Sequence, residues 1–297
     1  MKKNIIIVTG GAGFVGSHLI ERLVKLKKFK IFSLDNYSAG TKKNHIKKKN
    51  ITYIKGDTKN IEKHFKNKIK NINTIFHFGE FSRIYQSFNN FEKCIDSNIA
   101  GTKAVFNFCL KYKIKLIYSA TSASIGNKGE DKNLSPYAFS KAKNLEFLEN
   151  LRKWFNFKFE VIYFYNVYGK NHIRDGDMAT VIGIFEKQFL NKKPLTVVKP
   201  GTQTRRFTNV IDTIDVCIEA WRKNKCAHYS IASKKKYSVL QIAKQFGGKI
   251  KFLPERPGER YASALTKMHL SNKIVNKIAK RTIKKYISEF KKTNSYE

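Results

Sequence analysis

The chain has 297 residues, and its 59 Lys and Arg outnumber its 22 Asp and Glu, which gives a formal net charge of +37. This length fits one large α/β domain or a nucleotide-binding domain with a smaller lobe. A hydrophobic content of 41% is typical of a globular protein and excludes a disordered one. The N-terminal apolar run is too short for a signal peptide, and no stretch approaches the ~18 apolar residues of a membrane span. We therefore expect a cytoplasmic protein with no membrane partner.

The spacing of the cysteines and the distribution of charge further limit the kinds of protein that the chain can be. Cys94, Cys109, Cys217 and Cys226 form no Cys-x-x-Cys pair and have no histidine cluster beside them. We expect reduced thiols and no metal site. The lysines are spread along the whole chain, which favours a generally basic, solvated surface over a dedicated nucleic-acid face. A polyanion-binding face stays open as the alternative, and an anionic substrate would be attracted in either case.

Strand and helix signals alternate in the first half of the chain. We predict strands at 4–9, 30–34, 51–55, 74–78, 115–119 and 159–163, and helices at 14–27, 91–113 and 137–155. Buried apolar strands that alternate with helices imply an α/β fold with a Rossmann-type, doubly wound parallel sheet.

The alternation weakens after Gly169, where prolines punctuate the loops. We therefore predict a nucleotide-binding domain over 1–168 and a smaller, C-terminal substrate-binding lobe over 169–297, interleaved with the first. The last predicted helix, 272–292, is basic and amphipathic. An ordinary terminal helix with a solvated Lys face is favoured over a membrane-surface helix.

A glycine-rich turn, Gly-Gly-Ala-Gly-Phe-Val-Gly at 10–16, follows the first strand and opens the first helix. Gly10 permits a tight turn, Gly13 lets a pyrophosphate approach the backbone, and Gly16 allows close helix–strand packing. The phosphates would face the amides and the positive end of that helix. Asp35 ends the second strand, and its carboxylate would accept hydrogen bonds from a ribose 2′-hydroxyl and repel a 2′-phosphate. This pattern predicts NAD, and not NADP, as the cofactor.

Further cofactor contacts are expected along the same sheet edge. Asp57 follows the third strand and is a candidate for the adenine edge; capping of the next helix is its alternative role, and the two are compatible. Phe78 and Gly79 end the fourth strand, where the chain passes close to the cofactor. The complete expected set is Gly10, Gly13, Phe14, Val15, Gly16, Asp35, Asn36, Asp57, Phe78, Gly79, Asn98, Tyr137 and Lys141.

Tyr137 and Lys141 lie four residues apart on one face of a predicted helix. In a chain with 14 tyrosines and many lysines this spacing is weak alone, but Tyr137 opens the helix after the fifth strand. That strand ends in hydroxyl residues that include Thr121. An ordinary phenol, with a pKa of about 10, is a poor base, and the Lys141 ammonium and a cationic nicotinamide would stabilise its phenolate. Tyr137 would then remove a sugar hydroxyl proton, Thr121 would hold that hydroxyl, and Lys141 would reach the nicotinamide ribose; a strand-end hydrogen bond is the alternative for Thr121.

The ordered motifs resemble the extended short-chain dehydrogenase/reductase family, and within it the NAD-dependent epimerase/dehydratase group. The similarity runs from Ile5 to about Gly258. It rests on Thr-Gly-Gly-Ala-Gly-Phe-Val-Gly-Ser-His (9–18), Leu-Asp-Asn (34–36), Gly-Asp (56–57), Phe-His-Phe-Gly (76–79), Asn98 with Gly101-Thr102, Ser-Pro-Tyr-Ala-Phe-Ser-Lys (135–141), Tyr-Asn-Val-Tyr-Gly (165–169), Arg-Arg-Phe-Thr-Asn-Val (205–210) and Arg-Pro-Gly-Glu (256–259).

The resemblance also implies a substrate site. Asn166 would bind the nucleotide diphosphate, Arg205 and Arg256 would contact phosphate, and Glu259 would contact the nucleoside ribose. Arginine suits bidentate phosphate contacts, with surface ion pairs as the alternative. Glu80 and Arg83 stand where the family commonly has small or apolar residues; they either face the sugar or form a surface pair.

Two departures from the family pattern bear on the reaction. Ser122-Ala123 follows Thr121 where family dehydratases carry Asp-Glu, so a 4,6-dehydration lacks its acid and base. Only 15 residues separate Thr121 from Tyr137, which predicts a shortened substrate loop.

The resemblance therefore implies a homodimeric sugar-nucleotide epimerase that acts at C4 through a transient 4-keto intermediate, in surface polysaccharide or nucleotide-sugar metabolism. An NAD-dependent sugar-nucleotide oxidoreductase or dehydratase is the first alternative. A non-catalytic Rossmann protein that binds RNA or another polyanion is the second. Against that second alternative, Thr121, Tyr137 and Lys141 are all kept in register, and the basic surface lacks the interleaved aromatics of single-strand binders.

Overall fold

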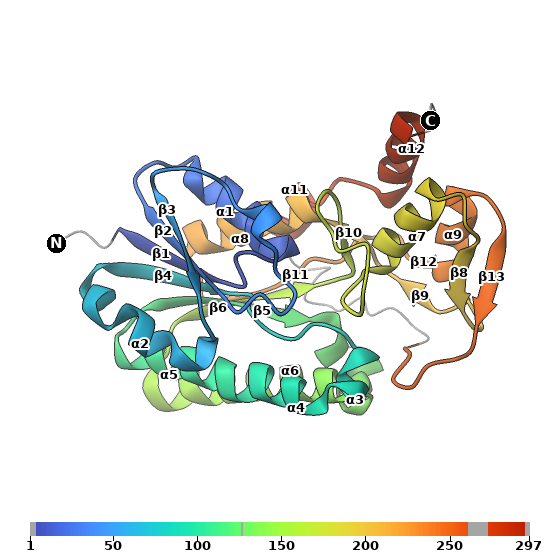
Figure 1. The fold of residues 1–297 in the computed structure, drawn as a ribbon. Helices are drawn as coiled ribbons and strands as arrows, with labels where there is room; N and C mark the ends of the chain where they lie inside the picture. Colours follow the sequence, from blue (N-terminus) through green and yellow to red (C-terminus); the bar gives the residue numbers. More distant parts are fainter. Residues whose placement is uncertain (1–3, 126, 261–272, 295–297) are drawn as a thin grey trace.

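A twisted parallel sheet forms the centre of the computed structural model, which describes residues 4–125, 127–260 and 273–294. Its strands lie in the order β11-β6-β5-β4-β1-β2-β3 (Figure 1). They are β1 (Ile5–Thr9), β2 (Lys30–Asp35), β3 (Ile51–Lys55), β4 (Ile72–His77), β5 (Lys115–Thr121), β6 (Phe159–Phe164) and β11 (His228–Ser230). The strand order reverses between β1 and β4, and in such sheets ligands bind in the crevice at the carboxyl ends of these strands. The predicted doubly wound fold is confirmed.

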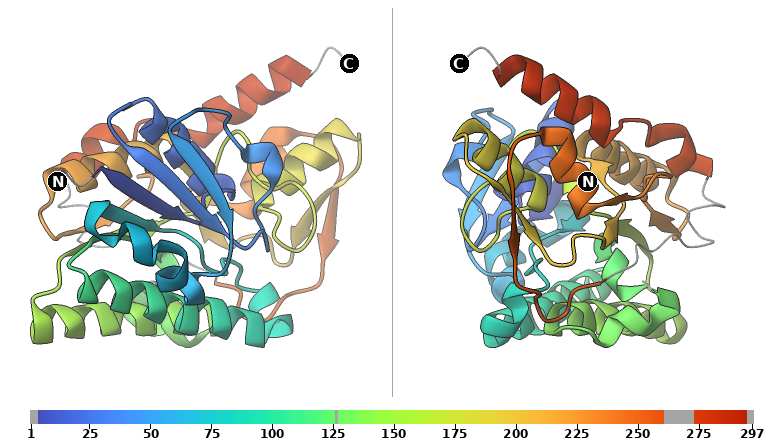
Figure 2. Two further views of the ribbon diagram at one scale, coloured as in Figure 1. Left: turned by 60° about the vertical axis from the view of Figure 1, so that its left-hand side comes forward. Right: turned by 90° about the vertical axis from the view of Figure 1, so that its right-hand side faces the viewer.

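Helices cover both faces of this sheet (Figures 1 and 2). One face carries α1 (Phe14–Val24), α8 (Val210–Lys223) and α11 (Lys273–Ile278); the other carries α2 (Ile61–Phe65), α3 (Gln86–Asn89), α4 (Phe91–Ile95), α5 (Thr102–Lys111) and α6 (Pro136–Phe155). Strand β1 is buried on both sides, because its alternate side chains enter different cores. Ile5 and Ile7 pack in the core that includes α5 and α6, and Ile6 and Val8 pack in the core that includes α1 and α8.

The long helix predicted over 91–113 is not uniform. A π-helical segment, Asp96–Gly101, separates α4 from α5, and the helix ends at Lys111. Local widening of this kind is frequent near functional sites. Here it lies beside α6, and it carries the buried side chain of Asn98.

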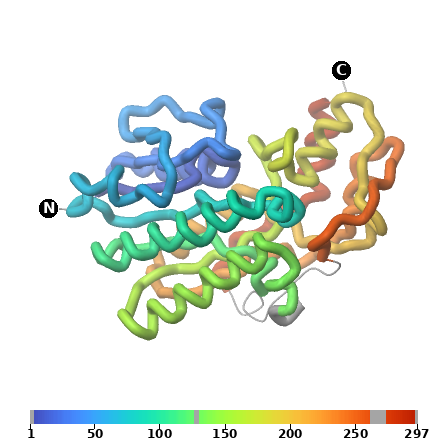
Figure 3. Tube along the Cα trace, turned by 60° about the horizontal axis from the view of Figure 1, so that its bottom comes forward, coloured from blue at the N-terminus to red at the C-terminus, as the bar shows by residue number. Residues whose placement is uncertain are grey.

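A smaller lobe lies at one end of the molecule, where Figure 3 shows the yellow to red segments gathered. Its parts are α7 (Val181–Leu190), β8 (Leu195–Val198), β9 (Thr204–Arg205), β12 (Tyr237–Ser238), α9 (Val239–Phe246), β13 (Ile250–Leu253) and α12 (Ile283–Asn294). Its core includes Phe185, Val197, Phe246 and Ile287. The short strands β7 (Val167–Tyr168) and β10 (Thr208–Asn209) pair in parallel, and the chain then returns to the main sheet through α8 and β11.

The single terminal helix predicted over 272–292 is wrong, although residue 272 itself lies outside the described residues. The chain breaks between α11 and α12 because the two helices serve different cores: Val275 packs with α1 and α8, and Ile287 packs in the smaller lobe. At the break, the backbone N–H of Arg281 donates to Asp212 Oδ2 at 2.9 Å. In the part of the chain that the structure describes, no helix is long and apolar enough to span a membrane.

Candidate active site

A cavity of about 720 Å³ opens at the carboxyl ends of the central strands and continues into the smaller lobe. Most of the residues expected from sequence line it, although they come from segments far apart in the chain. They are Gly10, Gly13, Phe14, Val15, Gly16, Asp35, Asn36, Phe78, Gly79, Glu80, Thr121, Tyr137, Lys141, Asn166, Arg205, Arg256 and Glu259. Asp57 and Asn98 do not line the cavity.

The glycine-rich turn forms a shallow cradle at the start of α1. Gly10 has a φ of 70°, and a Cβ there would lie 2.8 Å from the Cα of Gly79. A Cβ on Gly16 would overlap the carbonyl oxygen of Gly10. Gly13 is the N-cap of α1, no side chain caps the helix there, and its first turn holds no acidic residue. The first amides of the helix are therefore left for an anion, which suits a pyrophosphate.

Asp35 ends β2 with its carboxylate at the cavity. Its Oδ2 accepts from the backbone N–H of Ala12 at 2.9 Å, and its Oδ1 accepts from that of Tyr37 at 2.8 Å. Burial raises the pKa of Asp35, and these backbone hydrogen bonds oppose the shift. Lys42 and Lys43 are exposed, and among the described residues neither forms an ion pair with Asp35. Among the described residues, the Asp35 carboxylate therefore has no lysine partner at the cavity.

Asp57 and Asn98 have structural partners instead. Asp57 accepts from the backbone N–H of Lys59 at 2.9 Å and caps the 3-10 helix Thr58–Asn60, the alternative role expected for it. Asn98 is fully buried, accepts from the Phe81 N–H at 2.7 Å and donates to Ser140 Oγ at 3.0 Å. It ties the loop after β4 to α6, so its influence on the cavity is indirect.

Thr121 ends β5, Tyr137 and Lys141 lie one turn apart near the start of α6, and all three line the cavity. Ser135 starts α6 by accepting a hydrogen bond from the Ala138 N–H at 3.1 Å, which fixes the first turn that carries Tyr137. Thr121 Oγ1 accepts from the Ala123 N–H at 3.3 Å, the strand-end bond expected as its alternative. Its hydroxyl is near enough to the Tyr137 phenol to lower the pKa of that phenol.

The surroundings of Tyr137 raise the pKa of its phenol and so favour the protonated form. Burial raises the pKa of Tyr137 to about 12, and the Thr121 hydroxyl opposes the rise. The negative charge of Glu80 raises that pKa further, and the guanidinium groups of Arg83 and Arg260 lower it. To act as a base near neutral pH, Tyr137 needs a lower pKa, and this requires a positive charge near its phenol in addition to those of the protein.

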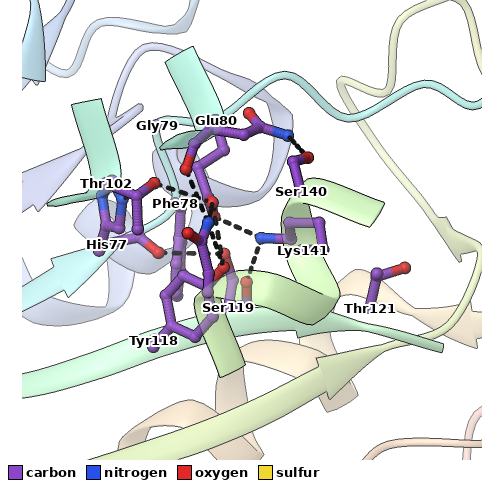
Figure 4. Close-up of polar contacts among 12 residues, drawn as sticks. His77, Phe78, Gly79, Glu80, Thr102, Tyr118, Ser119, Thr121, Ser140 and Lys141 are labelled. Atoms are coloured by element: carbon purple, nitrogen blue, oxygen red, sulfur yellow. Dashed lines mark hydrogen bonds and ion pairs between the residues drawn. The ribbon is translucent and has the colours of Figure 1, made fainter. Parts of the chain in front are cut away.

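Glu80 does not form the surface pair with Arg83 that was one of its two expected placements. Its carboxylate is buried and forms an ion pair with the ammonium of Lys141 on α6 (Figure 4). The Arg83 guanidinium donates instead to the carbonyl oxygens of Ser82, at 2.9 Å, and Met178, at 3.0 Å.

Arginine residues line the far end of the cavity. Arg205 forms a mostly buried ion pair with Glu259, in place of the surface pair that was the alternative. Arg256 lies over the ring of Tyr85, with 5.0 Å between its guanidinium carbon and the ring centroid.

Sequence reasoning did not identify Arg260, although this residue directly follows the Arg-Pro-Gly-Glu motif. It is 6% exposed, and it donates to the Ser122 carbonyl oxygen at 3.1 Å.

Comparison with known proteins identifies the family. The profile of the NAD dependent epimerase/dehydratase family matches residues 6–232, and the chain belongs to this family. The resemblance drawn from the motifs, the assignment as an enzyme of this family and NAD as the cofactor are thereby confirmed.

Individual relatives span most of the chain. A protein of Methanocaldococcus jannaschii, provisionally named UDP-glucose 4-epimerase, is 28% identical over 251 residues, which are 80% of each chain. The UDP-N-acetyl-alpha-D-glucosaminuronate decarboxylase of Bacillus cytotoxicus is 31% identical over 261 residues, 82% of this chain and 79% of its own. The fold is shared with the UDP-glucuronic acid 4-epimerase of Bacillus cereus, with a TM-score of 0.85, 24% identity and coverage of 98% and 99%.

Proposed function

We propose that this protein is an NAD-dependent sugar-nucleotide 4-epimerase. The observation that carries the proposal is one cavity that joins the glycine cradle and Asp35 to the pair Tyr137 and Lys141. The names of the relatives and of the structural neighbour supply the substrate class, since all three refer to UDP-linked sugars. The glycine turn and Asp35 fit the diphosphate and adenosine ribose of NAD, whose chemistry is a reversible hydride transfer at C4 of the sugar.

The proposed reaction needs a group that moves one proton. Tyr137 takes the proton of the C4 hydroxyl as that carbon is oxidised to a ketone, and gives a proton back when the carbon is reduced from the opposite face. Thr121 holds the same oxygen through its hydroxyl. Lys141 would stabilise the phenolate and would contact the nicotinamide ribose of a bound NAD. No net oxidant is consumed, because the electrons that leave C4 return to it.

The substrate diphosphate is assigned to Asn166, Arg205 and Arg256, and the nucleoside ribose to Glu259. Because Arg205 and Glu259 are paired, the guanidinium of Arg256 is the more accessible cation for phosphate. Dehydration is disfavoured, since Ser122 and the Ala123 methyl follow Thr121, where acid–base chemistry needs carboxyl groups.

Turnover is tested with UDP-, GDP- and TDP-linked hexoses. We expect one nucleotide class to be interconverted at C4, as seen by NMR of the sugar anomeric signals, without added NAD when the cofactor copurifies. Mass spectrometry of ligands released from the purified protein should show NAD. Tight RNA binding at physiological salt with no turnover would instead favour the polyanion-binding alternative.

NAD is expected to bind at least ~10-fold more tightly than NADP, which corresponds to about 1.4 kcal/mol. The reason is the like-charge contact between a 2′-phosphate and the Asp35 carboxylate, with Lys42 and Lys43 turned outward. Calorimetric titration of both cofactors at one salt concentration measures the ratio. Asp35→Asn should reduce the ratio, and equal binding by the unchanged protein would contradict the assignment of Asp35.

We also propose a homodimer in the cytoplasm. Apolar side chains lie exposed near one another on α3, α4 and the start of α6, where Phe88, Phe91 and Phe139 are 38%, 55% and 44% exposed. A second copy would cover them. The four free cysteines suit a reducing compartment. Light scattering on the purified protein measures the assembly state.

A further inference from the structure

The ion pair between Glu80 and Lys141 is almost completely enclosed. Their side chains are 2% and 5% exposed. Lys141 Nζ donates to Glu80 Oε2 and to the carbonyl oxygen of Ser119, the latter at 2.5 Å, and lies 4.6 Å from the ring centroid of Tyr118 (Figure 4). Within the described residues, Glu80 is the carboxylate that pairs with this ammonium.

The remaining contacts of Glu80 all come from hydrogen-bond donors. Its Oε1 accepts from the Tyr118 phenol and the Thr102 hydroxyl, each at 3.0 Å, and from Asn144 Nδ2 at 3.3 Å. A protonated carboxyl group would need an acceptor for its own hydrogen, whereas an ionised one accepts from every side. The Lys141 ammonium and the Asn144 amide nitrogen can only donate, so these two contacts favour the carboxylate form.

A directed chain of hydrogen bonds links Glu80 to the cofactor turn. Thr9 Oγ1 accepts from the N–H groups of Phe78 and Gly79, each at 3.1 Å, so its own hydrogen goes to His77 Nδ1 at 2.7 Å. His77 then donates from Nε2 to the Thr102 hydroxyl at 3.0 Å, which leaves the Thr102 hydrogen for Glu80. Burial lowers the pKa of His77 to about 4, so this chain adds no charge.

We propose that Glu80 is a positioning residue: it is the counter-ion that holds the Lys141 ammonium in place, one helical turn from Tyr137, and thereby sets the pH range in which this pair works. The inference rests on the proposed function of the pair. The Glu80 carboxylate contacts Lys141 and Asn144 of α6, Thr102 of α5 and Tyr118 of β5 (Figure 4). It acts on the reaction through Lys141.

The sign of its effect follows from charge alone. A negative charge favours the protonated form of every group near it, the Tyr137 phenol and the Lys141 ammonium alike. The other titratable groups that face them are Tyr118 on β5, His77 on β4, Cys94 on α4, and the guanidinium groups of Arg83 and Arg260. None of these supplies a second negative charge near neutral pH, so removing that of Glu80 lowers both pKa values in the same direction.

The test is the pH profile of kcat/KM for Glu80→Gln, which keeps the shape and removes the charge. We expect both limbs of the profile to move to lower pH by at least about one unit. Glu62→Gln is the matched control, because Glu62 accepts from Lys111 and Tyr112 at the surface and should leave both limbs unmoved. A lower maximum at an unchanged pH would show a merely structural role and overturn the proposal.

Glu80→Asp separates charge from position. It keeps the charge on a side chain one methylene shorter, so it should lower the maximum of kcat/KM at least ~10-fold while both limbs stay in place. Full activity in this variant would contradict the positioning role. A buried ammonium without its partner is destabilising, so Glu80→Gln can fail to fold. Glu80→Asp keeps the ion pair and then still tests the positioning role.

A second readout does not depend on turnover. Carbon-13 at Cζ of tyrosine, assigned to Tyr137 by its loss in Tyr137→Phe, reports ionisation of the phenol in the NAD complex without substrate. We expect Glu80→Gln to lower this titration midpoint by at least about one pH unit relative to the unchanged protein. Equal midpoints would overturn the proposal. Failure of every sugar nucleotide to turn over, with the midpoint still shifted, would refute the proposed function alone.

Discussion

Replacement of Tyr137 by Phe is expected to lower kcat at least ~10³-fold, because a positioned acid–base group contributes about 10²–10⁴-fold and no described neighbour replaces it. Thr121 holds the hydroxyl but is no base, and Lys141 is engaged by Glu80 and by the carbonyl oxygen of Ser119. The loss should appear in kcat and in kcat/KM equally, because the phenol acts in the transition state. Steady-state kinetics on the epimerised sugar nucleotide measure it.

Binding of NAD should change little in Tyr137→Phe, since the ring stays and the glycine turn and Asp35 are untouched. Tyr163→Phe is the matched control: it removes a buried phenol on β6 that bonds His228 on the neighbouring edge strand β11, at 3.0 Å and away from the cavity lining. The control should keep kcat within about 3-fold of the unchanged protein. Activity of Tyr137→Phe within 10-fold of the unchanged protein would contradict the acid–base role of Tyr137.

Local patterns were enough to predict the end of the cavity that the glycine turn and Asp35 line. The apolar strand, the glycine turn and the helix that follows are contiguous, so their mutual geometry is set within residues 5–24. The same holds for the end of β5 and the start of α6, where Ser135 and Pro136 mark the first turn that carries Tyr137. The sheet edge then brings Asp35 and Phe78 to the same crevice, because parallel strands end on one side.

Contacts between side chains that lie far apart in the sequence could not be predicted from local patterns. Glu80 and Lys141 are 61 residues apart, and nothing near either one marks a buried ion pair. Arg205 and Glu259 belong to motifs whose expected partner was substrate, yet each also finds the other. The break before α12 depends on two separate cores, which a periodic pattern in one segment does not reveal.

Replacement of Gly16 by Ala should cost about 3 kcal/mol of unfolding free energy and at least ~100-fold in affinity for NAD. The added methyl would overlap the carbonyl oxygen of Gly10 and lie 2.9 Å from the carbonyl carbon of Gly10 and the Cα of Gly11. All of these are backbone atoms, so relief requires opening the turn itself. Urea unfolding and calorimetric titration of NAD measure the two losses.

Gly13→Ala is the informative comparison within the same turn. Its Cβ would meet the Gly10 carbonyl oxygen alone, at 3.1 Å, and its φ of −78° is open to any residue. We expect a stability loss of no more than about 1 kcal/mol, the size of an N-cap effect. Affinity for NAD should still fall at least ~10-fold, because the methyl stands where the pyrophosphate must approach the backbone. Gly16→Ala thus tests how α1 packs on β1, and Gly13→Ala tests how the cofactor reaches the turn. A Gly13 variant that is less stable than the Gly16 variant, or that binds NAD unchanged, would contradict this division of roles.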